Sequence, residues 1–389
     1  MPASTSRRAH RLHRRPRHSR LSGRFELSTT DNCGMTAEAN GSTRSERDGS
    51  QARPLVVYLD MNHWYALGKA MARRSASAVD ADLLAKLRAL RAAGAVVLPL
   101  FAIHYMELRE NPRDRLTTEA ADAMEELSDF WALAPTSIVL AEEIDEQLQA
   151  RFGRPWTIRR SPRIGRGFGF AHGEPGHLAL DGPPEAQARL RHQLGDEGVS
   201  DLIAQANAMF ERAALAESRQ VPCFNVYGDR DAAEEALAGI CIFVDNLKTN
   251  PSLRAGLRDA VIARELAGEI RQSFSDAIQY AAGDDDKYEF ARKVTVSKDV
   301  LTDIAMSMPS RKVAVAVRMV YYKNATHTWK VSDLRDIEAL ALAVPSCDVV
   351  VTDKEVCGAL RQARFNEPEY ATVLSNRRDL LDRLSGDER

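Results

Sequence analysis

The stretch VVVTDKEVCGAL, residues 349–360, is an apolar run that ends at Thr352-Asp353 and continues with the pattern of a helix. A short apolar run that meets a polar residue and then an amphipathic segment predicts a buried strand followed by a helix. The stretch PLVVYLDMNHWYAL, residues 54–67, has the same plan, with Asp60 at the end of the run. Because parallel strands present their carboxyl ends at one edge of a sheet, Asp60 and Asp353 are expected to share that edge.

Strand-like runs alternate with helical patterns around these two stretches. The predicted strands are residues 54–60, 95–100, 136–140, 348–353 and 371–376. The predicted helices are residues 61–67, 79–93, 101–110, 118–134 and 333–344, with another that begins at Glu355. This alternation predicts an α/β fold with three layers, α/β/α, around a mainly parallel central sheet.

The middle of the chain interrupts the alternation. Residues 146–309 are predicted to be a mainly helical insertion, because residues 199–218 and 257–282 have long helical patterns. The α/β domain would then consist of a first part at residues 54–145 and a second part at residues 310–389.

The first 53 residues have a different composition from the rest. Residues 1–53 carry 11 Arg against 5 acidic residues, are rich in Ser, Gly and Thr, and have few large apolar side chains. Such a segment cannot bury enough surface to order itself, so a disordered basic tail is predicted. A transit peptide, a nucleic-acid-binding arm, or translated upstream sequence with Met35 as the true start are the alternative interpretations.

The whole chain of 389 residues, 44% hydrophobic and 28% charged, is long enough for one large or two ordinary globular domains. It contains no uninterrupted apolar run of about 18 residues, which argues against a membrane partner. Its five cysteines are scattered and form no CxxC pair, which argues against a disulfide framework and a zinc knuckle. A reducing cytoplasm is the expected compartment.

Two further acids are expected near the edge that Asp60 and Asp353 share. Glu107 lies on the predicted helix after the second strand, and Asp336 lies near the start of the helix that leads to the strand before Asp353. Four converging carboxylates repel one another, and all-oxygen ligands without Cys or His favour Mg²⁺ or Mn²⁺ over zinc. Taken singly, each Asp could instead be a turn former or helix cap, and Glu107 a solvated residue on a helix surface.

The order and spacing of these acids resemble those of the PIN-domain ribonucleases, a family that includes the toxins of many bacterial toxin-antitoxin pairs. The resemblance rests on VVYLDMNHW, with Asp60 and then Asn62, and on FAIHYMELRE, with Glu107 at the acidic position of the family. It also rests on DIEALALA followed by DVVVTDKEV, which contain Asp336 and Asp353. The match covers roughly residues 54–145 and 310–380 and leaves the long insertion unexplained.

The resemblance implies a PIN-like, metal-dependent endoribonuclease that hydrolyses phosphodiester bonds of RNA. One or two Mg²⁺ or Mn²⁺ ions held by the four acids would lower the pKa of a bound water and offset charge in the transition state. Asn62 and Thr352 would orient water or phosphate through hydrogen bonds. Asp333 is a nearby alternative to Asp336, which is preferred because the Ala-rich helical pattern begins directly after it. An antitoxin or regulatory protein and a second copy of the chain are the partners implied beside RNA.

An acidic cleft needs basic residues beside it to hold a polyanion. Arginines gather between residues 151 and 166, with aromatic residues among and after them: Arg151, Arg154, Arg159, Arg160, Arg163 and Arg166, with Trp156, Phe168 and Phe170. We expect Arg159, Arg160, Arg163 and Arg166 to contact the RNA backbone, while the aromatic rings stack on bases. The alternative is a solvated loop.

Two other functions remain open. A phosphatase of the haloacid-dehalogenase type would use Asp60 as a nucleophile, but that chemistry normally needs a second acid two residues later, where Asn62 stands. A non-catalytic nucleic-acid-binding or regulatory protein would keep the PIN-like fold without turnover. The histidines near the acids, His63 and His104, are expected to pack in the core rather than to act as general acids.

Overall fold

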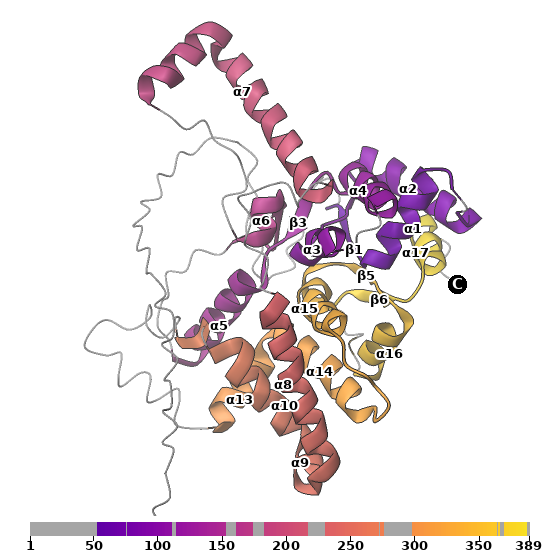
Figure 1. Ribbon diagram of the computed structural model, residues 1–389, viewed down its shortest axis with the longest axis vertical. Coiled ribbons are helices and arrows are strands. Elements are labelled where there is room, and N and C mark those ends of the chain that lie inside the picture. The colour runs from indigo at the N-terminus through magenta and orange to yellow at the C-terminus, as the bar shows by residue number, and fades with distance from the viewer. Residues whose placement is uncertain are drawn as a thin grey trace, which may run out of the picture. The chain divides into compact units, whose positions relative to one another are not determined.

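A parallel sheet of four short strands lies at the centre of the fold (Figure 1). The strands stand in the order β2-β1-β5-β6, with β1 at Leu55–Leu59, β2 at Val96–Val97, β5 at Val349–Val351 and β6 at Thr372–Leu374. β1 and β5 are level at their carboxyl ends, because Leu59 pairs with Val351. The backbone N–H of Asp60 continues this ladder and donates to the Val351 carbonyl oxygen at 3.0 Å.

The computed structural model describes residues 53–74, 76–110, 114–152, 161–173, 183–216, 230–271, 273–275, 298–363, 365 and 369–386. In the first part of the chain its other elements are α1 (Met61–Met71), α2 (Ala78–Ala92), α3 (Ala102–Glu110), α4 (Asp114–Ser128), β3 (Trp131–Leu133), α5 (Thr136–Phe152), β4 (Ile164–Arg166), α6 (Phe168–His172) and α7 (Pro184–Ala216). In the second part they are α8 (Arg230–Thr249), α9 (Pro251–Ala255), α10 (Leu257–Glu265), the π-helical turn η1 (Leu266–Ile270), α13 (Lys298–Ser307), α14 (Pro309–Lys323), α15 (Val331–Ser346), α16 (Lys354–Gln362) and α17 (Arg377–Ser385). Apart from Arg53, the predicted basic tail lies outside the described residues.

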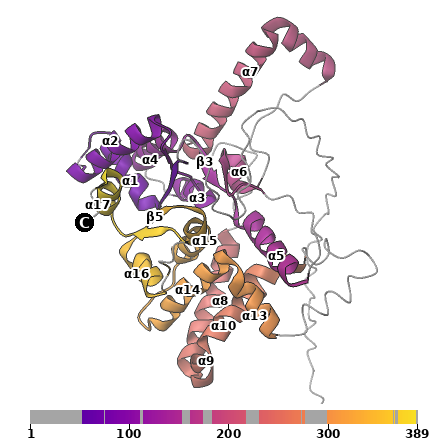
Figure 2. The same cartoon turned by 180° about the vertical axis from the view of Figure 1, so that it is seen from behind.

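Helices cover both faces of the sheet (Figures 1 and 2). Successive strand residues point to opposite faces, so Val57 and Leu59 enter one apolar cluster while Val56 and Tyr58 enter another. The first cluster includes residues of α1, α2, α4 and α17, and the second includes residues of α14, α15 and α16. The prediction of an α/β fold with a parallel sheet is therefore confirmed.

The strand predicted at residues 136–140 is wrong, because this segment is the first turn of α5. The backbone N–H groups of Ile138 and Val139 donate to the Pro135 carbonyl oxygen at 3.1 and 3.2 Å, so the helix begins directly after the proline. A short apolar run cannot by itself distinguish a strand from a buried helical turn.

The helix predicted over residues 118–134 ends early. α4 stops at Ser128, and the next two residues, Asp129 and Phe130, have positive φ angles of 49° and 55°. Positive φ in two successive residues that are not glycine ends a helix, and the chain continues as β3. β3 pairs with β4 in a separate two-stranded antiparallel sheet. An isolated bridge joins β3 to the segment after β2, where the Leu100 N–H donates to the Trp131 carbonyl oxygen at 2.7 Å.

The described part of the predicted insertion is mainly helical and has its own apolar core. This core joins α5, α8, α10, η1, α13 and α14, and includes Ile144, Leu148, Phe243, Val261, Ile304 and Val315. One end of α7 packs on α4 through Arg212, which binds the carboxylates of Asp122 and Glu125 at 2.5 and 2.6 Å. No helix among the residues that the structure describes combines the length and the apolar character needed to cross a bilayer.

Gly68 allows α1 and α4 to approach closely, and its replacement gives a first prediction. A Cβ atom at Gly68 would lie 2.5 Å from the Glu119 backbone carbonyl oxygen, so Gly68→Ala must push the helices apart. We expect this overpacking to lower the free energy of unfolding by about 1–3 kcal/mol. Gly358→Ala on α16 is the control: a Cβ atom there meets nothing within 4 Å, and the change should stabilise the protein by about 0.5–1 kcal/mol. Denaturant unfolding of both variants checks the pair, and equal stabilities would contradict the close helix contact.

Candidate functional site

Asp60 and Asp353 lie side by side at the carboxyl edge of the sheet, each directly before a helix. Asp60 caps α1, with Oδ1 accepting from the Met61 N–H at 2.7 Å, and Asp353 caps α16, with Oδ1 accepting from the Val356 N–H at 2.8 Å. The capping interpretation is therefore right for both. Each cap uses a single carboxylate oxygen, so it does not prevent the other oxygen from binding a ligand.

The same edge is a topological switch point. From β1 the chain continues to β2 on one side of β1. β5 pairs with the other side of β1, and from β5 the chain continues in the opposite direction to β6. Open parallel sheets bind their ligands in the crevice outside the strand ends at such a point. Asp60 and Asp353 flank it.

Asp336 lies inside α15 and does not cap it. Asp333 takes the capping role: its Oδ2 accepts from the Lys330 N–H at 2.8 Å and lies 3.1 Å from His327 Nε2. The helix-cap alternative for Asp336 is therefore wrong. Because Asp333 is already bound locally, the preference for Asp336 over Asp333 as the site residue gains a physical reason.

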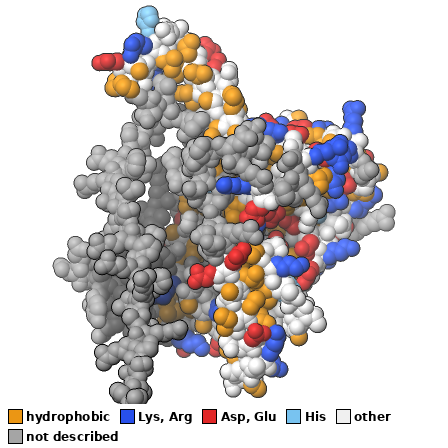
Figure 3. Space-filling model, in the orientation of Figure 1, with side chains coloured by type: hydrophobic (Ala, Val, Ile, Leu, Met, Phe, Trp, Pro, Cys, Tyr) orange, Lys and Arg blue, Asp and Glu red, His pale blue; other side chains and the backbone are white. Residues whose placement is uncertain are grey.

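The four predicted acids influence one another electrostatically. Burial raises the pKa of Asp60 to about 6, with a further contribution from Asp353, and raises the pKa of Glu107 to about 7, with a further contribution from Asp60. Burial and then the charges of Asp60, Glu107 and Asp353 raise the pKa of Asp336 to about 8. The fold therefore places two acids that follow β1 and β5, and two on α3 and α15, within electrostatic reach of one another in a partly dry environment. Acidic side chains also gather near the middle of the face in Figure 3, close to where Figure 1 draws α3.

A cation missed by the sequence reasoning stands beside these acids. Arg335 of α15 lowers the pKa of Glu107 against the effect of burial, and its guanidinium group binds Glu110 in a bidentate pair with both distances 2.7 Å. Its position directly before Asp336 in the sequence is the signal that could have identified it. Arg335 offsets part of the acidic charge at the rim of the site.

Two tyrosines also border the acids. Tyr58 lies two residues before Asp60 on the same face of the strand, and burial followed by the charges of Asp60, Glu107 and Asp336 raises its pKa. Burial and then Asp353 and Asp336 raise the pKa of Tyr321 in α14. Both phenols therefore stay protonated and can donate hydrogen bonds.

The histidines are buried, as expected. His104 is 1% exposed, stacks on Tyr58 with ring centroids 5.3 Å apart, and accepts from the Phe101 N–H at 3.0 Å through Nδ1. Burial lowers the pKa of His104 to about 3 and that of His63 to about 4. Both rings are neutral and pack in the core, which confirms their predicted role.

The two predicted orienting residues lie in different environments. Asn62 is exposed in the first turn of α1, two residues after Asp60, and its amide makes no hydrogen bond to the described part of the chain. Thr352 is 2% exposed, and its N–H donates to the Leu374 carbonyl oxygen at 3.1 Å. Asn62 is thus placed to contact a ligand, whereas the burial of Thr352 favours a packing role.

The carboxylate oxygens of these acids are suitable ligands for a hard cation, but the side chains do not lie close enough together to coordinate one. Across the described residues, no three or more His, Cys, Asp or Glu side chains stand close enough together to hold a metal ion. Mutual repulsion keeps such acids apart when no cation compensates their charge. A divalent cation would have to draw the side chains of Asp60, Glu107, Asp336 and Asp353 inward.

The structure gives little support to the predicted arginine contact with RNA. Arg159 and Arg160 lie outside the described residues. Arg163 pairs with Glu142 at 3.6 Å, while Arg166 pairs with Asp129 and lies over the Trp131 ring, 5.1 Å from its centroid. These two arginines are therefore engaged within the fold.

No protein-family model, no curated protein and no solved structure matches the chain. The chemistry of the carboxyl edge is therefore the guide to its function.

Proposed function

We propose that this protein is a divalent-metal-dependent endoribonuclease with a PIN-like, three-layer fold. The observation that carries the proposal is the electrostatic coupling of four half-buried carboxyl groups near the switch point of the parallel sheet. Helices on both faces of that sheet support the fold, and the order of the acids along the chain supports the family resemblance.

The acids would hold Mg²⁺ or Mn²⁺ through their oxygens, with Asp60 and Asp353 from the strand ends and Glu107 and Asp336 from the helices. Such a cation supplies Lewis acidity toward a phosphodiester. Asp336 and Glu107 would release protons on binding it, since without it their raised pKa values keep Asp336 mostly protonated and Glu107 about half protonated near neutral pH. Asn62 can orient the substrate by a hydrogen bond, and Arg335 can attract a phosphate toward the edge.

A non-catalytic nucleic-acid-binding or regulatory protein that keeps the PIN-like fold is the second candidate. It is favoured by one observation: the carboxyl groups of the described residues do not form a closed set of three ligands. A protein of this kind would bind RNA but leave it intact with or without a divalent cation. For either candidate we expect a cytoplasmic location. The expected partners are an antitoxin or regulatory protein and a second copy of the chain.

Purified protein is expected to cut internal linkages of single-stranded RNA when Mn²⁺ or Mg²⁺ is present and to stop when EDTA is added. It should release no phosphate from a small monoester, because Asp60 has no second acid two residues later to serve phosphatase chemistry. Gel analysis of end-labelled RNA and a colorimetric phosphate assay measure the two activities. Cleavage that survives EDTA would exclude the metal mechanism, and a phosphorylated Asp60 would decide for the phosphatase.

A further inference from the structure

A cavity of about 550 Å³ lies beside the acidic edge, between helices of the predicted insertion and helices of the α/β part. α8, α10 and η1 form one side of the cavity, and α14 and α15 form the other. Four arginines from three helices line it: Arg264 of α10, Arg311 and Arg318 of α14, and Arg335 of α15. Cavities of this size hold small molecules rather than single ions.

Three of these arginines have carboxylate partners. Glu265, whose side chain is fully buried, pairs with Arg318 and lies 3.7 Å from Arg311. Arg335 pairs with Glu110, as described above. These ion pairs hold the guanidinium groups of the cavity wall in place.

Arg264 differs from the other three, because it pairs with no carboxylate of the described residues. Its Nη1 donates to the Gly239 carbonyl oxygen at 3.3 Å, and its guanidinium group lies over the Phe243 ring, 4.9 Å from the centroid. Burial lowers the pKa of Arg318 to about 10 and the charge of Arg264 adds to the decrease, so the two cations are neighbours. Tyr322 and Glu338 oppose this decrease, and Glu338 is exposed and bound to Thr136 at 2.7 Å. Adjacent cations in a half-buried cavity favour an anionic ligand.

The cavity and the acidic edge share two elements. Arg335 lines the cavity, while the next residue on α15 is Asp336. On α3, Met106 lines the cavity, while the next residue is Glu107. The cavity and the acidic edge therefore border the same two helices, α3 and α15.

The rest of the lining is mainly apolar and includes Ile240, Leu334 and Ile337. Guanidinium groups bind phosphate in a bidentate manner and stack on flat rings, and an apolar wall accepts a base or a sugar. We propose that this cavity binds a nucleoside phosphate, with the phosphate at Arg264 and Arg318, and so provides a nucleotide subsite beside the four acids. The ligand is either a nucleotide of the RNA substrate, in which case the subsite rests on the proposed nuclease function, or a free nucleotide.

Two variants test the subsite by different routes. Arg264→Gln removes the cation that has no described carboxylate partner. Gly239→Leu fills the cavity from α8, where a Cβ atom would make only an ordinary 3.8 Å contact with Arg264 Nη2. Because leucine is also a better helix former than glycine, the second variant is expected to fold at least as well as the natural chain.

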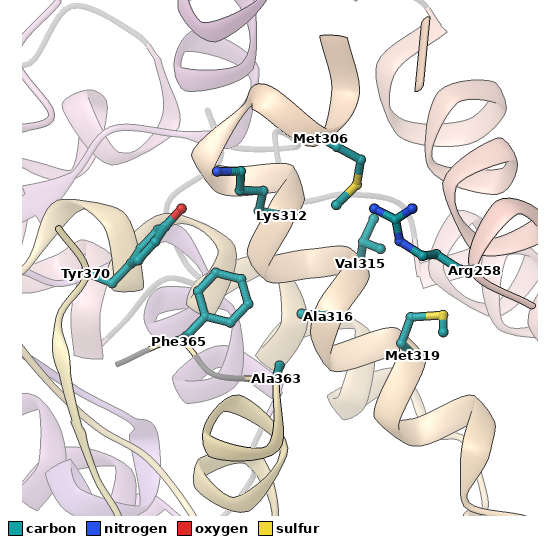
Figure 4. A pocket seen from close by; sticks show the side chains of 9 residues that line it. All are labelled: Arg258, Met306, Lys312, Val315, Ala316, Met319, Ala363, Phe365 and Tyr370. Atoms are coloured by element: carbon teal, nitrogen blue, oxygen red, sulfur yellow. The ribbon is translucent and has the colours of Figure 1, made fainter. Parts of the chain in front are cut away.

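The control is Arg258→Gln, which removes a cation from a second cavity of about 490 Å³. Figure 4 shows this cavity, with Arg258 near Met306 and Met319, and with Lys312 and Tyr370 toward its other end. The two glutamine variants therefore carry the same charge change in two different cavities.

The experiment measures binding of a labelled single-stranded RNA by anisotropy and of adenosine monophosphate by calorimetry, both to the full chain in EDTA. We expect Arg264→Gln and Gly239→Leu to weaken binding of at least one probe roughly tenfold, while Arg258→Gln changes neither. A loss for RNA alone assigns the subsite to the substrate, and a loss for the mononucleotide assigns it to a free ligand.

Unchanged binding of both probes in both cavity variants would overturn the proposal, as would a natural chain that binds neither probe. Because EDTA prevents metal-dependent cleavage, these outcomes are separate from the nuclease test. If the natural chain cuts RNA but the cavity variants bind both probes as it does, the subsite proposal alone is refuted. If the variants bind a probe more weakly but the natural chain cuts no RNA, the nuclease proposal alone is refuted.

Discussion

Asp336→Asn is expected to lower the rate of divalent-dependent RNA cleavage at least roughly 100-fold and to raise the melting temperature of the metal-free protein. The amide keeps the volume of the carboxyl group but removes its charge. Burial and four neighbouring acids raise the pKa of Asp336 to about 8, which means that the folded chain disfavours the ionised form. Removal of this repulsion stabilises the fold while it removes a ligand. Asp60→Asn and Asp353→Asn should also lose cleavage but stay folded, since Asn is as good a helix cap as Asp.

Asp333→Ala is the matched control on the same helix. Asp333 closes the start of α15 by accepting from the Lys330 N–H, so its loss should lower the free energy of unfolding by about 1 kcal/mol. Cleavage by the remaining folded protein should persist. Thermal unfolding in EDTA and RNA cleavage in Mn²⁺ separate the two variants. An Asp336→Asn protein that cuts RNA normally would remove Asp336 from the site.

The second large effect that we expect concerns pH: the stability of the metal-free protein should fall as the pH rises, whereas the stabilisation by a divalent cation should grow. In the folded chain the pKa values of Asp60, Glu107 and Asp336 are about 6, 7 and 8, whereas unfolded carboxyl groups titrate near pH 4. Between about pH 4 and pH 8 the folded chain therefore binds more protons than the unfolded chain. These acids thus make the free energy of unfolding fall as the pH rises through that range, and this contribution levels off above it.

A divalent cation binds the deprotonated carboxylates, so the stabilisation that it gives should grow over the same pH range. Melting temperatures measured in EDTA and in Mn²⁺ across this range check both halves of the prediction. Asp336→Asn should flatten the EDTA curve and shrink the Mn²⁺ effect. A metal effect of equal size at acid and alkaline pH would contradict binding by these acids.

The sequence was sufficient for the parts of the fold that local pattern determines. The apolar runs before Asp60 and Asp353 end abruptly at polar residues, so their strands and the following helices were found close to their true bounds. β3 was missed because the end of α4 depends on positive φ angles at Asp129 and Phe130, and these residue types do not predict such angles. The strand expected at residues 136–140 failed because apolarity without length does not select a secondary structure.

The candidate site follows the same division. The four acids could be selected by their places at strand ends and on the neighbouring helices. Tyr58, Tyr321 and Arg335 escaped notice, because their relation to the acids depends on which helices pack across the sheet edge. The cavity lined by Arg264 and Arg318 is further still from any local signal, since it arises where α10 meets α14. Arg163 shows that a local pattern can also mislead. The arginine-rich stretch around it suggested contact with RNA, whereas its partner in the fold is Glu142.

The pairing of β1 with β5 joins parts of the chain that are far apart in sequence: the Val56 N–H and the Asp348 carboxylate that it contacts are 292 residues apart. Such high contact order makes this ladder slow to form relative to the local helices. A chain that grows from its N-terminus carries Asp60 and Glu107 long before Asp336 and Asp353 exist. For a protein proposed to cut RNA, the four acids can thus meet only after residues 336–353 have been made, so a shorter nascent chain would lack the complete carboxyl edge.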